Sequence, residues 1–221
     1  MGKRGKKPKR ASPPQWSAEF AYAVGLLATD GSLSNDGRHI VFVSQDREQL
    51  ENMMRALGIR VSIGEVVSGY TKKKATRIQF GDVVLYRFLL DIGLMPNKTK
   101  IIGIIKVPDA YFFDFLRGSL DGDGSFYSYW DPRWPSSFMY YLSFVSASEA
   151  HIGWLRQTLQ RLLSVKGSIS QDRKKNTIQL KYAKKEALTI IRSMYHSKEC
   201  ICLARKKLKI QAALGMMGER F

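Results

Sequence analysis

The order of apolar and polar positions in the first half of the chain predicts helix, hairpin, helix, hairpin, helix. Residues 17–30 form a mostly apolar stretch of helix length, and Ile40–Ser44 is a short apolar segment typical of a strand. Apolar residues at helical spacing follow, and Arg77–Phe80 then precedes a third helix at Val83–Ile92. Asn35-Asp36-Gly37 is a strong signal for a tight turn in the first hairpin.

The second half of the chain repeats this pattern. Residues 110–123 form another apolar stretch of helix length, and Tyr141–Ser146 matches the first strand segment. Thr177–Leu180 then precedes a helix at Lys185–Tyr195. The segment Asp131–Ser137 contains two prolines and predicts a longer loop at the place of the first tight turn. The sequence therefore predicts two similar α+β halves.

Turn and breaker residues divide the chain further. Met95-Pro96-Asn97-Lys98 is expected to end one helix, and Val107-Pro108-Asp109 to introduce the next. A C-terminal helix is expected to carry Arg205–Lys209 on its polar face and Cys200 and Cys202 in its core. The expected division is a basic disordered tail at 1–14, a first half at 15–95, a linker at 96–109, a second half at 110–212 and a C-terminal tail at 213–221.

The chain is strongly basic, with 36 Lys and Arg against 19 Asp and Glu and a formal net charge of +17. Residues 1–10 hold six of the basic side chains, and residues 108–221 carry 18 basic against 10 acidic ones. Such a charge predicts a polyanionic partner, with double-stranded DNA as the first candidate. No apolar run is long enough for a membrane span, so we expect an intracellular protein that uses no membrane, in an undetermined compartment.

Each apolar stretch ends in Asp-Gly-Ser, which places Asp30 and Asp123 at equivalent helix ends. A carboxylate there opposes the helix dipole at a cost of about 0.3–1 kcal/mol. Its occurrence in both repeats indicates a function, although an Asp-Gly turn that binds backbone donors would also account for it. Gly25 and Gly118 lie five residues earlier and are expected to let the two helices pack closely. Such packing would bring the carboxylates together, where a divalent cation would offset their repulsion.

These residues resemble the LAGLIDADG homing endonucleases in their single-chain, two-motif form. The motif aligns with Ala23–Gly31 and Leu116–Gly124, and the resemblance extends over about residues 15–210. It implies an α+β fold of two pseudo-twofold-related αββαββα halves, whose antiparallel four-stranded sheets form a DNA-binding saddle. It also implies a monomer that makes a metal-dependent double-strand break in a long, asymmetric DNA target, as part of an intron- or intein-type mobile element.

The resemblance assigns metal binding to the last acid of each motif and to the carbonyl before it. On this chain those residues are Asp30, Asp123, Thr29 and Gly122. Mg²⁺ is the expected metal, and Ca²⁺ or Mn²⁺ would substitute for it in binding. The first acid of the motif is replaced by Ala28 in one copy and kept as Asp121 in the other.

Two supporting residues are also implied by the resemblance. A lysine near the scissile phosphate is matched by Lys181, and its counterpart in the first half is taken as Gly81. A glutamine that orders active-site water is matched by Gln45, with Ala147 opposite it. This asymmetry predicts that the two strands are cut at unequal rates.

One face of each sheet is expected to pack on helices and the other to meet DNA. An antiparallel ribbon fits the major groove, where the base pairs are distinguishable. The candidate DNA contacts in the first half are Arg38, Lys72, Lys73, Lys74, Arg77 and Gln79. Those in the second half are Tyr127, Tyr129, Arg133, Gln171, Arg173, Lys174, Lys175 and Gln179. The stronger positive charge of the second half predicts a firmer hold on its half of the target.

The sequence leaves two alternative functions open. One is a group I intron RNA maturase of the same fold, whose partner would be intron RNA. The other is a catalytically inactive DNA-binding protein. A zinc site is not expected, because Cys200, Cys202 and His196 lack a second pair of ligands at suitable spacing.

Overall fold

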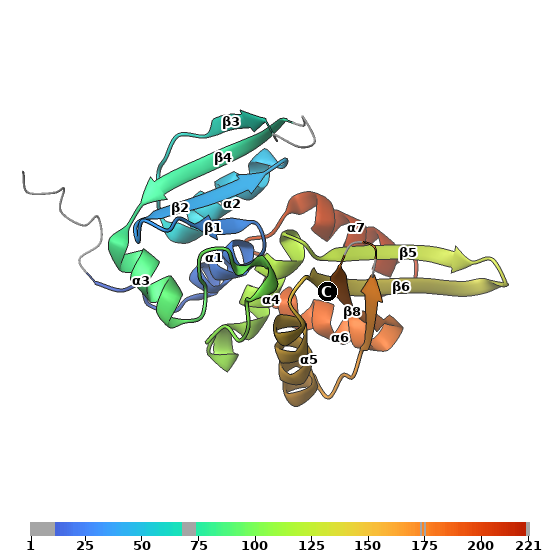
Figure 1. The fold of residues 1–221 in the computed structure, drawn as a ribbon. Helices are drawn as coiled ribbons and strands as arrows, with labels where there is room; N and C mark the ends of the chain where they lie inside the picture. Colours follow the sequence, from blue (N-terminus) through green and yellow to red (C-terminus); the bar gives the residue numbers. More distant parts are fainter. Residues whose placement is uncertain (1–11, 68–73, 173, 175, 220–221) are drawn as a thin grey trace, which may run out of the picture.

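A computed structural model describes residues 12–67, 74–172, 174 and 176–219, and it confirms the predicted α+β architecture of two αββαββα halves (Figure 1). The first half comprises α1 (Ala18–Thr29), β1 (Gly31–Leu33), β2 (His39–Ser44), α2 (Arg47–Leu57), β3 (Gly64–Val67), β4 (Lys74–Gly81) and α3 (Val83–Asp91). The second comprises α4 (Phe112–Asp121), β5 (Ser125–Asp131), β6 (Trp134–Ser146), α5 (Glu149–Leu163), β7 (Ser168–Asp172), β8 (Thr177–Ala183), α6 (Lys184–Met194) and α7 (Ala204–Gly215). Lys98–Lys100 and Asp109–Tyr111 form 3₁₀ turns in the connection between the halves.

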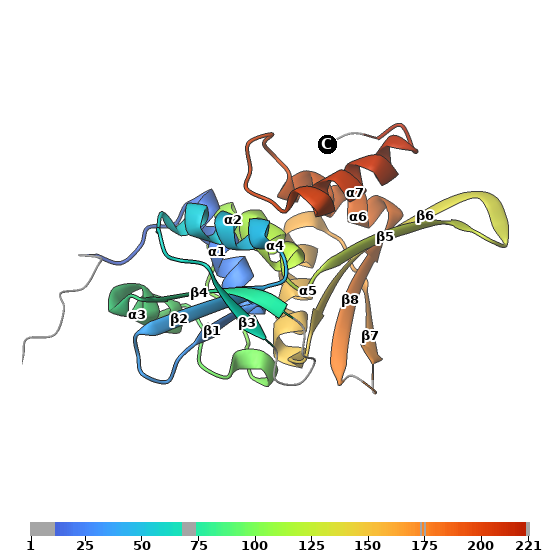
Figure 2. The ribbon, with the colours of Figure 1, turned by 90° about the horizontal axis from the view of Figure 1, so that it is seen from above.

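Each half contains one antiparallel four-stranded sheet, with strand orders β1-β2-β4-β3 and β5-β6-β8-β7. Helices α1 and α4 lie between the two sheets at the centre of the molecule (Figures 1 and 2). Every residue of α1 from Phe20 to Ala28 is buried. Burial on all sides explains why this stretch of the sequence is apolar without helical periodicity.

The central helices pack on each other through glycine. A Cβ atom added to Gly25 would lie 2.1 Å from the carbonyl oxygen of Phe115 on α4. A Cβ atom added to Gly118 would lie 2.1 Å from the carbonyl oxygen of Tyr22 on α1. Since no side chain fits at either position, the two backbones approach as closely as helices can.

Strand pairing divides each sheet into a covered and an open face. In the first sheet Phe42 pairs with Ile78 and both are buried, whereas Val43 pairs with the exposed Arg77. In the second sheet the buried pair is Phe144 and Leu180. Because side chains alternate along a strand, the open faces carry the residues one position away from these buried pairs.

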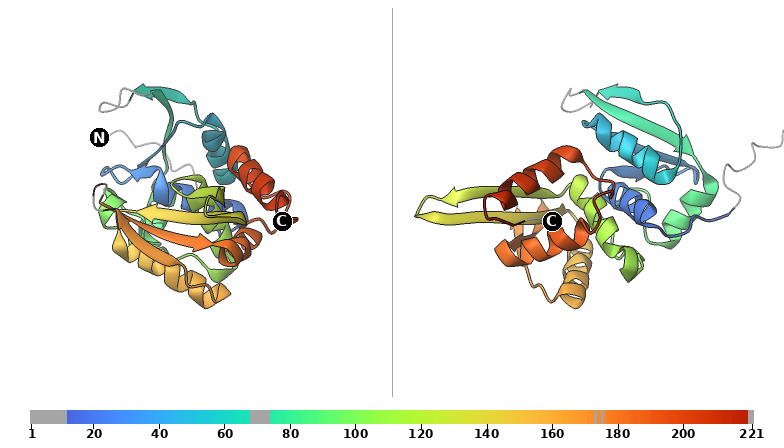
Figure 3. Two further views of the ribbon diagram at one scale, coloured as in Figure 1. Left: turned by 90° about the vertical axis from the view of Figure 1, so that its right-hand side faces the viewer. Right: turned by 180° about the vertical axis from the view of Figure 1, so that it is seen from behind.

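The strands β5 and β6 continue beyond the second sheet as a two-stranded arm (Figures 2 and 3). Strand β6 pairs with β8 only from Tyr141 to Ser146, so its first residues have only β5 as a neighbour. The long loop expected at Asp131–Ser137 is therefore wrong, because β5 ends and β6 begins within that segment. The register jumps at Asp131, which leaves Pro135 without a ladder partner and makes a proline tolerable there.

The C-terminal region also differs from expectation. Helix α7 runs to Gly215 and buries Ala213 and Leu214, so the packed structure continues past the expected boundary at residue 212. Cys200 and Cys202 lie in the segment before α7 rather than in a helix, and both are half-buried free thiols. Residues 1–11 of the expected basic tail fall outside the described residues. In the described ranges, no helix has the length and apolar character needed to cross a membrane.

Candidate active site

The two motif helices end next to each other. Asp30 is the C-terminal cap of α1, and Gly122 takes the same place on α4, directly before Asp123. A Cβ atom added to Gly122 would lie 2.0 Å from the Thr29 hydroxyl and 3.1 Å from a carboxylate oxygen of Asp30. The fold therefore brings the four residues assigned to the metal into one place.

The two carboxylates affect each other electrostatically. Burial, followed by the negative charge of Asp123, raises the pKa of Asp30 to about 6. Desolvation also raises the pKa of Asp123, although its side chain remains exposed, and the nearby Lys98 and Lys206 act in the opposite direction. Asp30 and Asp123 thus form a pair of acids whose negative charge is costly without a cation.

Lys98 and Lys206 are the cations that the protein itself supplies, and the sequence did not reveal this role for either. The Nζ atom of the buried Lys98 donates hydrogen bonds to the carbonyl oxygens of Thr29, at 3.2 Å, and Gly31. The Nζ atom of Lys206 donates to the carbonyl oxygens of Leu120, Asp121, Gly122 and Gly124, at 2.5–3.1 Å. Lys206 was expected on the polar face of a C-terminal helix; it does lie on α7, and its ammonium group turns toward the end of α4.

Gln49, which the sequence did not single out, binds the Asp30 carboxylate. Its Nε2 atom donates to Asp30 Oδ2 at 3.3 Å and to the Asp121 carbonyl at 3.1 Å, and its Oε1 atom accepts from Ser44 Oγ at 2.6 Å. Gln45 is exposed and lines the same hollow as Asp30 and Gln49. The pattern that could have identified Gln49 in the sequence is a polar residue on the buried side of an amphipathic helix, in its first turn.

The side chain of Asp121 is buried behind the hollow that Asp30 and Gln49 line. It is 1% exposed, and its Oδ2 atom accepts hydrogen bonds from the Tyr22 hydroxyl at 2.8 Å and from Leu203 N at 2.7 Å. Burial raises the pKa of Asp121 to about 6. These contacts tie α4 to α1 and to the segment before α7.

Lys181 lies on the open face of the second sheet, with its Nζ atom 5.0 Å from the centre of the Tyr141 ring. The strand register gives Lys181 a different counterpart in the first half from the one that was expected. Ser143 pairs with Lys181, and the equivalent position in β2, Val41, pairs with Gln79 rather than Gly81. Gln79 therefore takes the place of Lys181, and the Arg38 side chain lies over Gly81, within 2.8 Å of an added Cβ atom.

The candidate DNA contacts fall into three groups. Strand alternation places several of them on the open faces, namely Arg77, Gln79, Tyr127, Tyr129 and Gln179. Others lie at the ends of strands or in turns, namely Arg38, Lys74, Arg133, Gln171 and Lys174. Gln171 pairs with Ile178 and so belongs to the helix-covered side, and Arg133 is held by Asp131 at 3.3 Å. Lys72, Lys73, Arg173 and Lys175 lie outside the described residues.

The oxygen atoms at the two helix ends suit a hard cation that is bound partly by the protein and partly by a substrate. The described residues contain no group of three or more His, Cys, Asp or Glu side chains that could hold a metal alone. Two carboxylates and two carbonyl oxygens meet at the helix ends, and Mg²⁺ commonly combines one or two carboxylates with water and substrate phosphate. The residues therefore fit a divalent metal whose coordination is completed by a nucleic acid.

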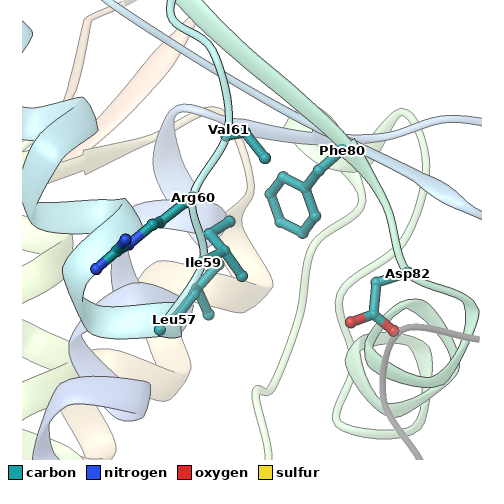
Figure 4. Close-up of a pocket in the computed structure, with 7 residues that line it drawn as sticks. Leu57, Ile59, Arg60, Val61, Phe80 and Asp82 are labelled. Atoms are coloured by element: carbon teal, nitrogen blue, oxygen red, sulfur yellow. The ribbon is translucent and has the colours of Figure 1, made fainter.

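A separate pocket lies between the end of α2 and the first sheet (Figure 4). Its walls are apolar and consist of Leu57, Ile59, Val61 and Phe80. Asp82 lies at its edge and caps α3 by accepting a hydrogen bond from Leu85 N. Its residues serve packing and helix capping, and none of them belongs to the acidic site.

Solved structures of DNA-bound nucleases share this architecture. Over 92% of its length the chain superposes on 93% of the meganuclease I-SmaMI bound to uncleaveable DNA, with a TM-score of 0.60 and 15% identity. The fold is that of the LAGLIDADG homing endonucleases. The homing endonuclease I-DmoI in complex with DNA and Mn shares it over 81% of this chain and 97% of its own, with a TM-score of 0.53 and 16% identity.

Two further comparisons limit what the LAGLIDADG fold alone says about function. Full-length DUF199/WhiA from Thermatoga maritima matches 94% of this chain at 19% identity and a TM-score of 0.58, and the chain covers 63% of that protein. One subunit of the A-type ATP synthase of Methanopyrus kandleri is 29% identical over 124 residues, which are 54% of this chain but only 11% of that protein. No family model matches the chain.

The raised pKa values of the acids predict how stability depends on pH. Between the ordinary carboxyl range near 4 and a pH of about 6, Asp30 and Asp121 bind more protons in the folded metal-free protein than in the unfolded chain, an effect larger than the opposing one of the buried His151, whose pKa is lowered. The free energy of unfolding of the protein is therefore expected to fall as the pH rises through this window. Asp30→Asn is expected to raise the free energy of unfolding at pH 7 by up to about 3 kcal/mol, since burial raises the pKa of Asp30 from 3.8 to about 6 and each pKa unit corresponds to about 1.4 kcal/mol.

Thermal or urea unfolding with a chelator present, between pH 4 and pH 7, measures both effects. The matched control is Asp91→Asn, which changes an exposed carboxylate on α3 and is expected to leave the curve unchanged. An Asp30→Asn protein no more stable than wild type at pH 7 would contradict the electrostatic description of the site.

Proposed function

We propose that this protein is a divalent-metal-dependent DNA endonuclease that cuts both strands of a long target site. The observation that carries the proposal is the meeting of Asp30 and Asp123 at the ends of two helices in the LAGLIDADG fold. Homing endonucleases of this fold are known bound to DNA, and one of them in the presence of Mn. A pair of carboxylates brought together in this way is otherwise difficult to explain.

The open faces of the sheets supply the expected DNA-binding surface. In the second sheet the rings of Tyr127 and Tyr129 both stack on the ring of Tyr141, at centroid separations of 5.0 and 6.1 Å, and Lys181 lies against Tyr141. In the first sheet Arg77 and Gln79 are exposed. Arginine and glutamine side chains on an antiparallel ribbon can read base edges in the major groove.

In the proposed reaction each residue at the helix ends has a separate task. Asp30 and Asp123, together with the carbonyl oxygens of Thr29 and Gly122, would hold Mg²⁺, which supplies Lewis-acid stabilisation of phosphate charge and an activated water. Gln49 fixes the orientation of the Asp30 carboxylate through its amide. Lys181 lies on the DNA-facing side and would neutralise charge on a nearby phosphate.

We also propose that the protein belongs to a mobile genetic element. A homing endonuclease carried inside a host protein would match only a small part of a longer chain. The match to 11% of an ATP synthase subunit is of this kind and supports an intein-type origin. A DNA-binding protein that does not cleave is the second candidate, because the similarity extends to DUF199/WhiA, whose name does not mark it as a nuclease.

A cleavage selection tests the proposal directly. The wild-type protein is incubated with a library of randomised duplex DNA and Mg²⁺, and the newly formed ends are captured and sequenced. A nuclease yields ends that share one long asymmetric sequence and disappear when the metal is chelated. Enrichment of bound but intact DNA would favour the non-cleaving candidate, and preferential binding of structured intron RNA would favour a maturase.

The salt dependence of DNA binding is expected to be steep. If the basic surface neutralises about eight phosphates, log K should fall against log salt concentration with a slope of about −7, since each contact contributes about −0.9. Lys74→Ala, at the exposed start of β4, is expected to reduce that slope by about one contact, whereas Lys100→Ala, in the linker, should not change it. Fluorescence anisotropy of labelled target at a series of salt concentrations gives the slope, and a value near zero would exclude phosphate-driven binding.

A further inference from the structure

Two lysines occupy equivalent positions around the acidic pair. Lys98 follows the third helix of the first half, and Lys206 follows the third helix of the second half, on α7. Each directs its ammonium group at the C-terminal end of the motif helix of its own half. Both halves thus place a lysine ammonium group at the end of their motif helix, although the two lysines come from different segments of the chain.

The carbonyl oxygens at these helix ends lack partners within the helix and carry the negative end of its dipole. Two such ends and two carboxylates meet here, so the metal-free protein concentrates negative charge at its centre. Lys98 binds the carbonyls on either side of Asp30, and Lys206 binds those on either side of Asp123. The Coulomb attraction of both acids acts on both lysines.

The same carbonyls, those of Thr29 and Gly122, are the ones assigned to the metal, and each already accepts a hydrogen bond from a lysine. We propose that Lys98 and Lys206 act as resident cations that keep divalent metal binding weak until DNA is present. This inference rests on the proposed metal-dependent function. A phosphate brought in by DNA adds the negative charge that the two ammonium groups have offset, and the metal then binds tightly.

Substitutions can separate the effect of each lysine's charge from the effect of its hydrogen bonds. Lys98→Gln keeps a donor for the carbonyls of Thr29 and Gly31 but removes the positive charge, whereas Lys98→Arg keeps the charge. Lys206→Gln and Lys206→Arg make the same comparison at the other helix. Lys100→Gln is the matched control, because Lys100 is exposed in the same 3₁₀ turn as Lys98.

Binding of Mn²⁺ to the DNA-free protein, followed by electron paramagnetic resonance, is the test. Wild type, both arginine variants and Lys100→Gln are expected to bind Mn²⁺ weakly and alike. Each glutamine variant is expected to bind it about tenfold more tightly, from the loss of one nearby unit charge. The gain should be lost when Asp30→Asn is added. A purely structural role for the lysines would lower stability without raising metal affinity.

Two outcomes would overturn the proposal. Either the glutamine variants bind Mn²⁺ no more tightly than wild type, or wild type already binds it tightly without DNA. If one glutamine variant does not fold, the variant at the other helix decides. None of these results depends on cleavage, so failure of the lysine proposal and failure of the nuclease proposal are distinguishable.

Discussion

Asp30→Asn and Asp123→Asn are each expected to reduce the rate of DNA cleavage by about 10³-fold or more, while target binding stays within a few fold of wild type. Removal of one hydrogen-bond donor that stabilises transition-state charge typically costs about two to three orders of magnitude, and loss of a ligand to a catalytic metal removes a stronger stabilisation of the same kind. Asparagine preserves the size of the side chain and can keep the contact of Asp30 with Gln49. The loss should therefore fall on catalysis rather than on folding.

The measurement is single-turnover cleavage of a selected target, with affinity determined separately in Ca²⁺. Asp36→Asn serves as the control, because Asp36 lies exposed in the first hairpin turn, away from the helix ends. Cleavage that survives both active-site substitutions would refute the assignment of the metal to this pair. Loss of binding in parallel with cleavage would instead indicate that the carboxylates only support the structure.

Gly25→Val is expected to lower the free energy of unfolding by about 3 kcal/mol or more, at or above the upper end of the range of about 1–3 kcal/mol that is typical of steric overpacking in a core. The first atom of the new side chain would lie 2.1 Å from the Phe115 carbonyl oxygen and 2.8 Å from the Ser119 backbone nitrogen. Neither backbone atom can move without separating α1 from α4. For a chain of this size the melting temperature should fall by about 10 °C or more.

Gly153→Ala is the matched control for this prediction. Gly153 lies within α5, and an added Cβ atom would meet nothing within 4 Å. Alanine there should be neutral or stabilising by up to about 1 kcal/mol, as in most helices. If the Gly25→Val protein melts at the wild-type temperature, close packing of α1 on α4 is not what brings Asp30 and Asp123 together.

Much of the architecture could be predicted from the sequence because local signals repeat. The two Asp-Gly-Ser helix ends, the matching strands and the glycines at equal spacing specified both halves, and the observed order of elements agrees. The acidic pair followed from the same repeat, because equivalent ends of two packed helices must meet.

The residues that complete the site could not be predicted, because their contacts are set by tertiary structure. Lys98 lies 68 residues from Asp30, and Lys206 lies 83 residues from Asp123, with nothing in the local pattern to connect them. The counterpart of Lys181 was misjudged because sequence similarity aligned Gln79 with Gln179, whereas strand register aligns it with Lys181. A shift of two residues preserves the alternation of buried and open positions, so the hydrophobic pattern could not reveal it.

Anomalous diffraction from crystals of the protein–DNA complex grown with Mn²⁺ tests the central claim most directly. We expect a manganese peak at the ends of α1 and α4, about 2.1 Å from a carboxylate oxygen of Asp30 or Asp123, that also contacts a DNA phosphate. DNA bound across the sheets with no manganese at these two aspartates would contradict it.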